Sequence, residues 1–596
     1  MRKCLEGEIR LKDPKFDMLR VEKFLWAIAV AVIACFGLTL SWPLMVASVL
    51  CLALVGMVVG IGRFGKACPI TALDGLFAVT LGYFGWRAWQ SPVWDLARYD
   101  LMLMAGGTII YLLVRLGRRA EMASATVGVM AATVLANGLV YLTHLAGGEA
   151  WIPLDAVSKF AQSSPDFGLF QDYGSLGNAM AVIGMVLCSF AVAARTAGPK
   201  LRSAVGVIGA FALILAFMSG SRSAALALVV AAALMVVVLW LRAAALEASA
   251  RKRMRLIVLA GACCAGTLVA VFALRTFVER DDKVLKTGVT TEQNVRQGYW
   301  GMAIDQVAEA PLLGSGARSY SYKSNTYWQG ALVSSDASPD YVHNEYLQVL
   351  ADYGIVGLVM LLGLLGAHWL AALKSLALGS AQSRLSWLRM AGLLGLTLVM
   401  VQSFTDFPLR LPFNMVLAAV CLAWCAPPRA KENNRQKGEK GQRLKEKDLD
   451  DGDPCGESMV KGHWSSGLDD GNKGRAERIK GKGLAVVLVI LSAGVAMFTG
   501  RELWASAPLL LAKQQRVDFD ASSEEHQRLL RAYTLSNQRS PDFRKSQRIG
   551  QIYQIAYERG QDPAAFEMAE ASYKQSLQHH PYNLVAMLSL ANLYRD

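Results

Sequence analysis

Apolar runs and short polar breaks alternate along most of the first 426 residues of this chain. Runs of about 20 residues, long enough to cross a bilayer as a helix, lie at 24–40, 42–61, 70–89, 99–114, 123–146, 174–194, 201–220, 223–241, 256–274, 354–373, 388–404 and 411–426. One further run, 484–500, follows after a polar gap. The pattern predicts an all-α polytopic membrane protein with about thirteen spanning helices.

Composition and charge agree with this class. The chain is 54% apolar, and its net charge of +14 comes largely from basic residues in alternate loops, such as Arg115, Arg118 and Arg119. That placement follows the positive-inside rule and needs no nucleic-acid partner. It predicts a cytoplasmic N-terminus, and thirteen spans then put the C-terminus outside.

Metal or disulfide chemistry is not expected. Ten cysteines are present, mostly within the predicted spans, and none lies in residues 275–341 or 501–596. No Cys/His pattern has zinc-ligand spacing. We therefore expect no disulfide framework and no zinc site.

The chain divides into four predicted parts. Residues 1–426 form a membrane body of about twelve spanning helices, with a large outer loop at 275–342. Residues 427–482 are rich in Lys, Glu, Asp and Gly and are expected to be a disordered cytoplasmic linker. Residues 483–500 form an additional transmembrane helix. Residues 501–596 are expected to fold as a soluble helical tail.

The tail has small and aromatic residues at tetratricopeptide-like spacing. They are Ala571, Tyr573, Leu577, Pro581, Asn583, Ala586, Leu590, Ala591 and Tyr594, with an earlier partial match at Leu529, Ala532, Leu535 and Pro541. The distance between the two prolines exceeds one standard repeat. We expect a helical repeat that binds a partner protein or influences the choice of acceptor.

A candidate proton acceptor stands where the large loop re-enters the membrane. His343, followed by Asn344, lies at this point, just before an apolar helical run. A neutral imidazole has a pKa suited to taking a proton from a hydroxyl near neutral pH. The alternative is a histidine that only packs at the start of a helix.

Three arginines lie near the same predicted membrane face. Arg296 and Arg318 lie in the large loop, and Arg222 lies in the turn Ser219-Gly220-Ser221-Arg222-Ser223. Guanidinium groups bind phosphate with two parallel hydrogen bonds, so the set indicates an anionic, phosphate-bearing substrate. Snorkelling or capping for Arg222, simple solvation for Arg296 and an ordinary turn for Arg318 are the alternatives. Asp406 and Asp74 are weaker candidates, expected to pack or to pair.

These residues resemble the O-antigen ligase and polymerase family of bacterial envelope glycosyltransferases. The resemblance covers residues 123–357 well and rests on three motifs: Ser221-Arg222-Ser223-Ala224, the stretch from Arg296 to Tyr320 with Pro311-Leu312-Leu313-Gly314, and His343-Asn344 followed by Leu347, Leu350, Gly354 and Gly357. A looser match is Gly174-Ser175-Leu176-Gly177-Asn178. The glycines at 354 and 357 are expected to allow close packing of the re-entering helix.

The resemblance implies a polytopic GT-C-type glycosyltransferase of the bacterial inner membrane, with its active site and tail in the periplasm. The implied donor is an undecaprenyl-diphosphate-linked glycan, and the acceptor is lipid A–core sugar, another glycan or a protein side chain. The resemblance implies that the reaction needs no metal and no cofactor. His343 would be the catalytic base. Arg222, Arg296 and Arg318 would bind the diphosphate, with Asn178, Ser221 and Asn344 as further candidates.

Alternatives remain open within and outside this class. An O-antigen or exopolysaccharide polymerase is the second hypothesis, and a protein O-oligosaccharyltransferase is the third. A glycolipid transporter is a fourth, but such a protein would be expected to bury charges near the bilayer midplane and often to show repeated halves with broken helices. No repeat is evident in the body.

Overall fold

The computed structural model describes residues 42–63, 70–116, 119–145, 173–194, 197–243, 291–327, 340–378, 386–427, 470–512 and 522–595. These parts are helical and contain no strand. The predicted spans 24–40 and 256–274, the loop at 147–172 and most of the predicted linker lie outside the described residues.

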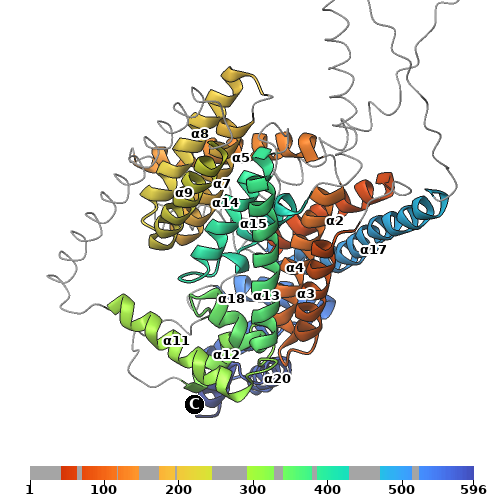
Figure 1. The fold of residues 1–596 in the computed structure, drawn as a ribbon. Coiled ribbons are helices and arrows are strands. Elements are labelled where there is room, and N and C mark those ends of the chain that lie inside the picture. The colour runs from red at the N-terminus through yellow and green to blue at the C-terminus, as the bar shows by residue number, and fades with distance from the viewer. Residues whose placement is uncertain are drawn as a thin grey trace, which may run out of the picture.

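The helices of the membrane body follow the predicted apolar runs (Figure 1). They are α2 (Trp42–Arg63), α3 (Ala72–Trp89), α4 (Trp94–Leu116), α5 (Arg119–Leu145), α7 (Tyr173–Ala193), α8 (Pro199–Met218), α9 (Arg222–Ala243), α13 (Glu345–Leu378), α14 (Ser386–Gln402) and α15 (Pro412–Cys425). Each begins and ends within about five residues of its apolar run, apart from α13, which starts nine residues early.

Helix length and hydropathy confirm the predicted fold class. Seven helices of the described residues are long and apolar enough to cross a membrane, namely α4, most of α5, α7, α8, α9, α13 and the apolar part of α17. The apolar stretches of α2, α14 and α15 are shorter. The core lies among α4, α7, α14 and α15, whose side chains form one continuous buried cluster.

The described part of the large loop, residues 291–327 and 340–342, contains two further helices at one end of the body. α11 (Thr291–Glu309) is followed by α12 (Tyr320–Lys323) and a 3₁₀ turn, η2 (Ser324–Tyr327). In Figure 1 both helices lie beyond the lower end of α13. A second 3₁₀ turn, η3 (Pro408–Arg410), lies between α14 and α15.

α13 is broken at Gly354. The backbone there has φ 71° and ψ −175°, so α13 is really two helices that meet at this residue. Residues 311–316 of the large loop fill the break: Ile355 N–H donates to Pro311 O (2.9 Å) and Gly316 N–H donates to Asp352 O (2.8 Å). Gly354 had been expected only to allow close helix packing, and it also supplies a conformation that other residues rarely adopt.

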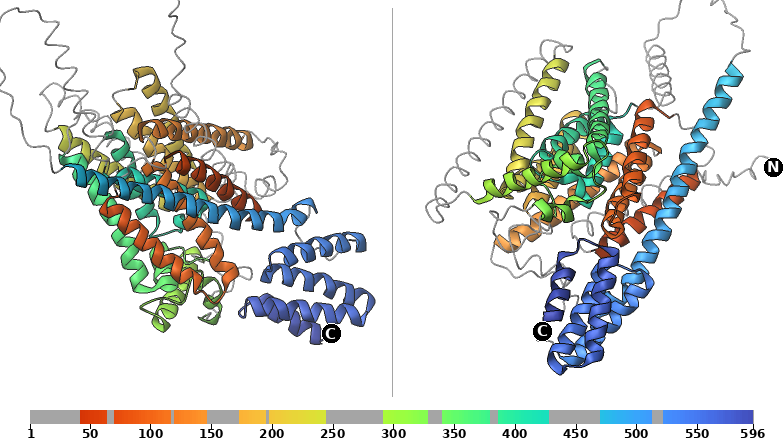
Figure 2. Two further views of the ribbon diagram at one scale, coloured as in Figure 1. Left: turned by 90° about the vertical axis from the view of Figure 1, so that its right-hand side faces the viewer. Right: turned by 90° about the horizontal axis from the view of Figure 1, so that it is seen from below.

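The helix that precedes the tail is longer than predicted. α17 (Asp470–Leu511) begins inside the segment expected to be a disordered linker up to residue 482. The prediction of disorder is wrong for residues 470–482, because Arg475-Ala476-Glu477-Arg478 is polar but consists of strong helix formers. α17 also runs eleven residues past the predicted end at Gly500, and it packs along α2 (Figure 2).

Within residues 522–595, the described part of the tail beyond α17, there are four helices: α18 (Ser523–Arg539), α19 (Phe543–Gly560), α20 (Pro563–His579) and α21 (Leu584–Arg595). Pro541 and Pro581 both fall between helices. Leu529, Tyr573 and Ala586 are buried, whereas Leu535 and Tyr594 are exposed. The tail lies at the same end of the body as α11 and α12 (Figures 1 and 2). Its identity as a tetratricopeptide repeat remains a prediction.

Candidate active site

His343 lies at the junction of three segments. It immediately precedes α13, and its ring faces Tyr299 of α11 (centroids 6.1 Å apart, nearly parallel) and the edge of Phe407 (5.0 Å, 71°). Phe407 belongs to the α14–α15 turn, defined here as residues 403–411. That turn also accepts the Glu345 N–H at Ser403 O (2.8 Å). The start of α13 is thereby fixed against the turn.

The surroundings of His343 keep its imidazole neutral. Burial, and secondarily the charge of Arg296, lower the pKa of His343 to about 4 from its ordinary value near 6.5. Among the described residues, neither ring nitrogen has a hydrogen-bond partner. The backbone of His343 is left-handed, with φ 55°, a conformation that the packing around it must hold in place. Such an imidazole is unprotonated at neutral pH, so its free ring nitrogen is available to a proton donor, although burial and Arg296 both disfavour the imidazolium that would form.

Arg296 stands beside this imidazole. It lies on α11, is half-buried, and donates from Nη1 to the carbonyl of Thr405 in the α14–α15 turn (3.3 Å). Its charge is the second cause of the lowered pKa of His343. The structure therefore brings together two of the predicted site residues, one neutral and one cationic.

A chain of polar contacts joins the Arg222 turn to the same place. Ser221 Oγ lies 3.0 Å from Ser223 Oγ, which donates to Asn178 Oδ1 (3.2 Å). Asn178 Nδ2 in turn donates to Asp406 Oδ2 (2.8 Å) in the α14–α15 turn. The side chain of Arg222 itself is exposed at the first residue of α9. Asn178 and Ser221 thus hold the α9 start and the α14–α15 turn together.

Asn344 has a local structural task. Its side-chain Oδ1 accepts from the backbone N–H groups of Tyr346 and Leu347, both at 3.1 Å. This is an N-cap, and it satisfies donors that the first turn of α13 would otherwise leave unpaired. Asn344 therefore fixes the point at which the helix starts, directly after His343.

Arg318 is already paired inside the protein. Its Nε lies 2.7 Å from Asp100 Oδ1 of α4, and its guanidinium lies over the Tyr99 ring, 3.8 Å from the centroid. Its side chain is 13% exposed. The ring of Tyr341 is also near (5.5 Å) and stacks on Phe407. Arg318 thus contacts the aromatic group around His343, but an acidic partner occupies it.

A buried cluster of ion pairs lies next to His343 and was not predicted from the sequence. Arg410 of η3 pairs with Asp100 (2.5 Å), Glu345 (3.0 Å) and Asp352 (3.2 Å), and all four side chains are almost fully buried. Asp352 also accepts from Ser319 Oγ (2.9 Å). Three carboxylates on two helices therefore surround one guanidinium. An arginine between two spans on the predicted outer face, where basic residues are scarce, was the available signal.

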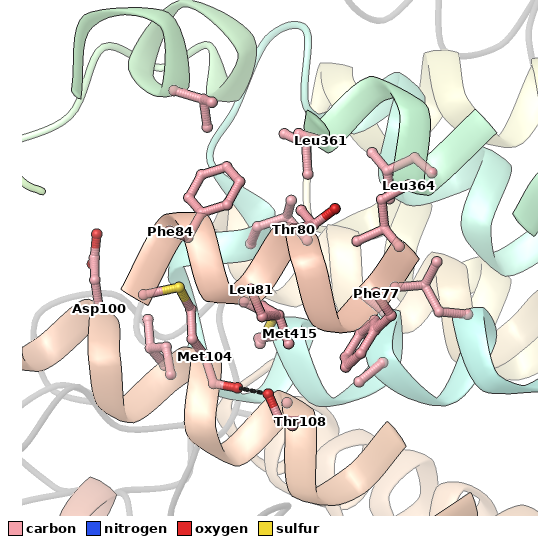
Figure 3. Close-up of a pocket in the computed structure, with 18 of the residues that line it drawn as sticks. Phe77, Thr80, Leu81, Phe84, Asp100, Met104, Thr108, Leu361, Leu364 and Met415 are labelled. Atoms are coloured by element: carbon pink, nitrogen blue, oxygen red, sulfur yellow. Dashed lines mark hydrogen bonds between the residues drawn. The ribbon is translucent and has the colours of Figure 1, made fainter. Parts of the chain in front are cut away.

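An apolar pocket lies beside this cluster. Its walls come from α3, α4, both parts of α13 and α15, and include Phe77, Phe84 and Leu364 (Figure 3). Asp100 and Arg410 line the pocket as well. Apolar surface and buried charge therefore meet at one place. Asp74, the other carboxylate noted in the sequence, lies outside the pocket and pairs with Arg115 (2.7 Å).

Among the described residues, no group of three or more His, Cys, Asp or Glu side chains is arranged to hold a metal ion.

Comparison with known families agrees with the motifs seen in the sequence. Residues 207–362 match a family model described as O-antigen ligase. The matched segment runs from α8 into the second part of α13 and so contains Arg222, Arg296, Arg318 and His343, but not Asn178 or the α14–α15 turn. A search of curated proteins finds no match. The family match supports a membrane enzyme of glycan transfer in the general sense.

Proposed function

We propose that this protein transfers a glycan from an undecaprenyl-diphosphate carrier to an acceptor hydroxyl, at the end of the membrane body where His343 and Arg296 meet. The observation that carries the proposal is the neutral, half-buried His343 beside Arg296 within the segment that matches the family model. A general base and a cation for the leaving group are the two parts that such a transfer needs.

In the proposed step the acceptor oxygen attacks the anomeric carbon of the glycan and forms the new glycosidic bond. The bond from that carbon to the diphosphate oxygen breaks, and the lipid diphosphate leaves with the electron pair. His343 takes the proton of the acceptor hydroxyl and later releases it to water. Attack opposite the leaving group inverts the anomeric centre.

The arginines have different tasks in this proposal. Arg296 is close to His343, and Arg222 is exposed at the start of α9, so both have guanidinium groups available to a diphosphate. Arg318 is neutralised by Asp100, which supports a positioning role for it rather than direct diphosphate binding. The apolar pocket beside Arg410 offers a surface suited to part of the isoprenoid chain.

The break in α13 also bears on the transporter hypothesis, because broken helices and buried charges occur in transporters as well. In transporters the backbone groups at the break bind the cargo. Here residues 311–316 of the same chain occupy them: Ser315 N–H donates to Ala351 O (3.1 Å) and Val356 N–H donates to Leu312 O (3.3 Å). The backbone groups at the break are therefore bonded within the protein and are not open to a cargo, which supports glycan transfer over transport.

The test is transfer in vitro with the purified full chain and a carrier-linked glycan. Core lipid, a second carrier-linked glycan and a peptide are offered side by side, because ligase, polymerase and protein transferase would use the same chemistry on different acceptors. Product on one of them is expected. His343→Gln should lower turnover by roughly 10²–10⁴-fold.

Two comparisons make the test decisive. His526→Gln, in the tail helix α18, serves as the matched control, and rates are compared per mole of folded protein. Near-normal turnover of His343→Gln would remove the base from the mechanism. Absence of product with every acceptor, at a donor concentration that binds the wild-type protein, would refute transfer itself.

A further inference from the structure

One short segment of the body contacts both the large loop and the tail. Residues 91–100 run from the end of α3 into α4, and we call them the docking segment. On the loop side, Ser91 Oγ donates to Ala317 O (3.0 Å), and Asp100 pairs with Arg318 (2.7 Å). The docking segment therefore fixes the part of the loop that carries Arg318.

The docking segment also binds the tail, through one hydrogen bond to a carboxylate and through ion pairs. Asp95 Oδ2 accepts the backbone N–H of Phe543 at 3.0 Å, where α19 begins. Arg98 pairs with Asp542 in the α18–α19 turn and with Glu502 of α17 (3.5 Å). These side chains are almost fully buried. Buried, mutually paired charges are costly to separate, so the tail is firmly attached to α4.

Loop and tail also touch each other directly. Tyr322 of α12 is 2% exposed, and its ring stacks on Tyr582 of the tail (5.0 Å, 15°) and meets His580 edge-on (5.5 Å, 73°). Val93 of the docking segment and Phe543 of the tail pack against Tyr322 as well. Tyr322 is thus enclosed between body and tail.

The placement of α12 depends on such contacts. A helix of four residues has no stability of its own, so packing must order it. On its inner side Tyr320 N–H donates to Asp352 Oδ1 (3.1 Å), next to the Arg410 cluster. On its other side Tyr322 is held by the tail. The inner contact joins α12 to the candidate active site, and the outer contact joins it to the tail.

We propose that the tail is a clamp that positions the large loop of the candidate active site. Tyr322, Tyr582 and Arg98 are its positioning residues. A ligand that binds the tail and displaces Tyr582 would loosen α12 and, through it, the segment that carries Arg318. The tail had been expected to influence acceptor or partner choice only, whereas the clamp gives it a direct mechanical connection to the site. The clamp belongs to the fold and is measurable without a transfer assay.

The experiment measures hydrogen–deuterium exchange of the full chain in detergent or nanodiscs. Tyr582→Ala removes the stacked ring at a position that is 43% exposed, so the variant is expected to fold. Exchange in residues 311–327 should rise by about twofold to thirteenfold, the factor that corresponds to ~0.5–1.5 kcal/mol for one aromatic pair. Exchange in α14, in the core of the body, should stay unchanged.

Two further variants separate a clamp from general destabilisation. Tyr582→Phe keeps the ring and should restore wild-type protection of residues 311–327. Tyr594→Ala changes an exposed tail tyrosine whose hydroxyl bonds Glu570 of the tail, and it should leave the loop unchanged. Unaltered exchange in Tyr582→Ala, or an equal rise in Tyr594→Ala, would overturn the proposal.

A photo-crosslink provides an independent measurement. p-Benzoylphenylalanine at position 582 should crosslink to the peptide that contains Tyr322, and the same group at position 594 should not. A crosslink from position 582 to other parts of the body alone would place the tail elsewhere and refute the clamp.

Discussion

Replacing Gly354 by alanine tests the broken helix most directly. The backbone at this residue, φ 71° and ψ −175°, lies in a region that is essentially restricted to glycine, and an alanine there costs about 1–3 kcal/mol. The new methyl group would also stand 2.2 Å from Leu312 O and 2.6 Å from Gly314 N. Both are backbone atoms, so no side-chain rotation can relieve the clash.

Relief requires residues 311–316 to move away from the break. That movement weakens the bonds from Ile355 N–H to Pro311 O and from Gly316 N–H to Asp352 O, each worth about 1 kcal/mol. Strain and lost bonds together give a destabilisation of about 3–5 kcal/mol. The ratio of folded to unfolded protein should therefore fall by roughly 10²–10⁴-fold.

Reversible unfolding of the purified protein in mixed detergent micelles, followed by tryptophan fluorescence, measures this change. Gly363→Ala and Gly366→Ala are matched controls on the same helix, because an added Cβ would meet no atom within 4 Å at either position. Both controls should be neutral or slightly stabilising, since alanine is the better helix former. If Gly354→Ala has the same free energy of unfolding as these controls, residues 311–316 do not hold the break in the way described.

Two other predictions concern the charges of the site. Arg296→Gln should raise the pKa of His343 from about 4 toward its ordinary value, because the cation favours the neutral imidazole; burial, the larger cause, remains. The acid limb of the kcat/KM profile should move to higher pH, and a limb that stays in place or moves down would contradict the coupling. Arg410→Met should destabilise the protein by roughly 3–5 kcal/mol, since it leaves Asp100, Glu345 and Asp352 buried without their shared cation. The exposed Arg531→Ala should stay within about 0.5 kcal/mol in the same unfolding measurement.

The membrane body could be predicted from the sequence because its helices depend on one property. A bilayer requires every backbone polar group to be satisfied within the helix, so an apolar run of sufficient length is nearly enough to define a span. The runs 174–194 and 201–220 became α7 and α8 with small differences at their ends. The sequence also singled out His343 and Arg296, which the structure places near each other, because a titratable residue and a cation near a membrane end are rare enough to stand out. Their role in a site stays a prediction.

The parts that were missed depend on contacts between distant residues. Nothing local in the sequence distinguishes Gly354, which breaks α13, from Gly357, which does not. The break exists because residues 311–316, forty residues earlier, supply the missing hydrogen-bond partners. Arg318 looked available for a substrate because its partner Asp100 lies more than two hundred residues away. The docking of the tail on Arg98 could not be predicted for the same reason, because its partners Glu502 and Asp542 lie more than four hundred residues away.

The pairing of α2 with α17 has a consequence for how the protein is made. Where the two helices cross, a Cβ on Gly56 would stand 2.4 Å from Ser492 Oγ, and a Cβ on Gly60 would stand 2.7 Å from Val489 Cγ2, so two glycines admit α17 closely. More than four hundred residues separate these helices along the chain, and α2 therefore enters the membrane long before its partner is synthesised. We therefore expect α17 to assemble onto α2 as an independently inserted unit. The protein should then tolerate division into two polypeptides within residues 428–469, co-expressed and joined again in the bilayer.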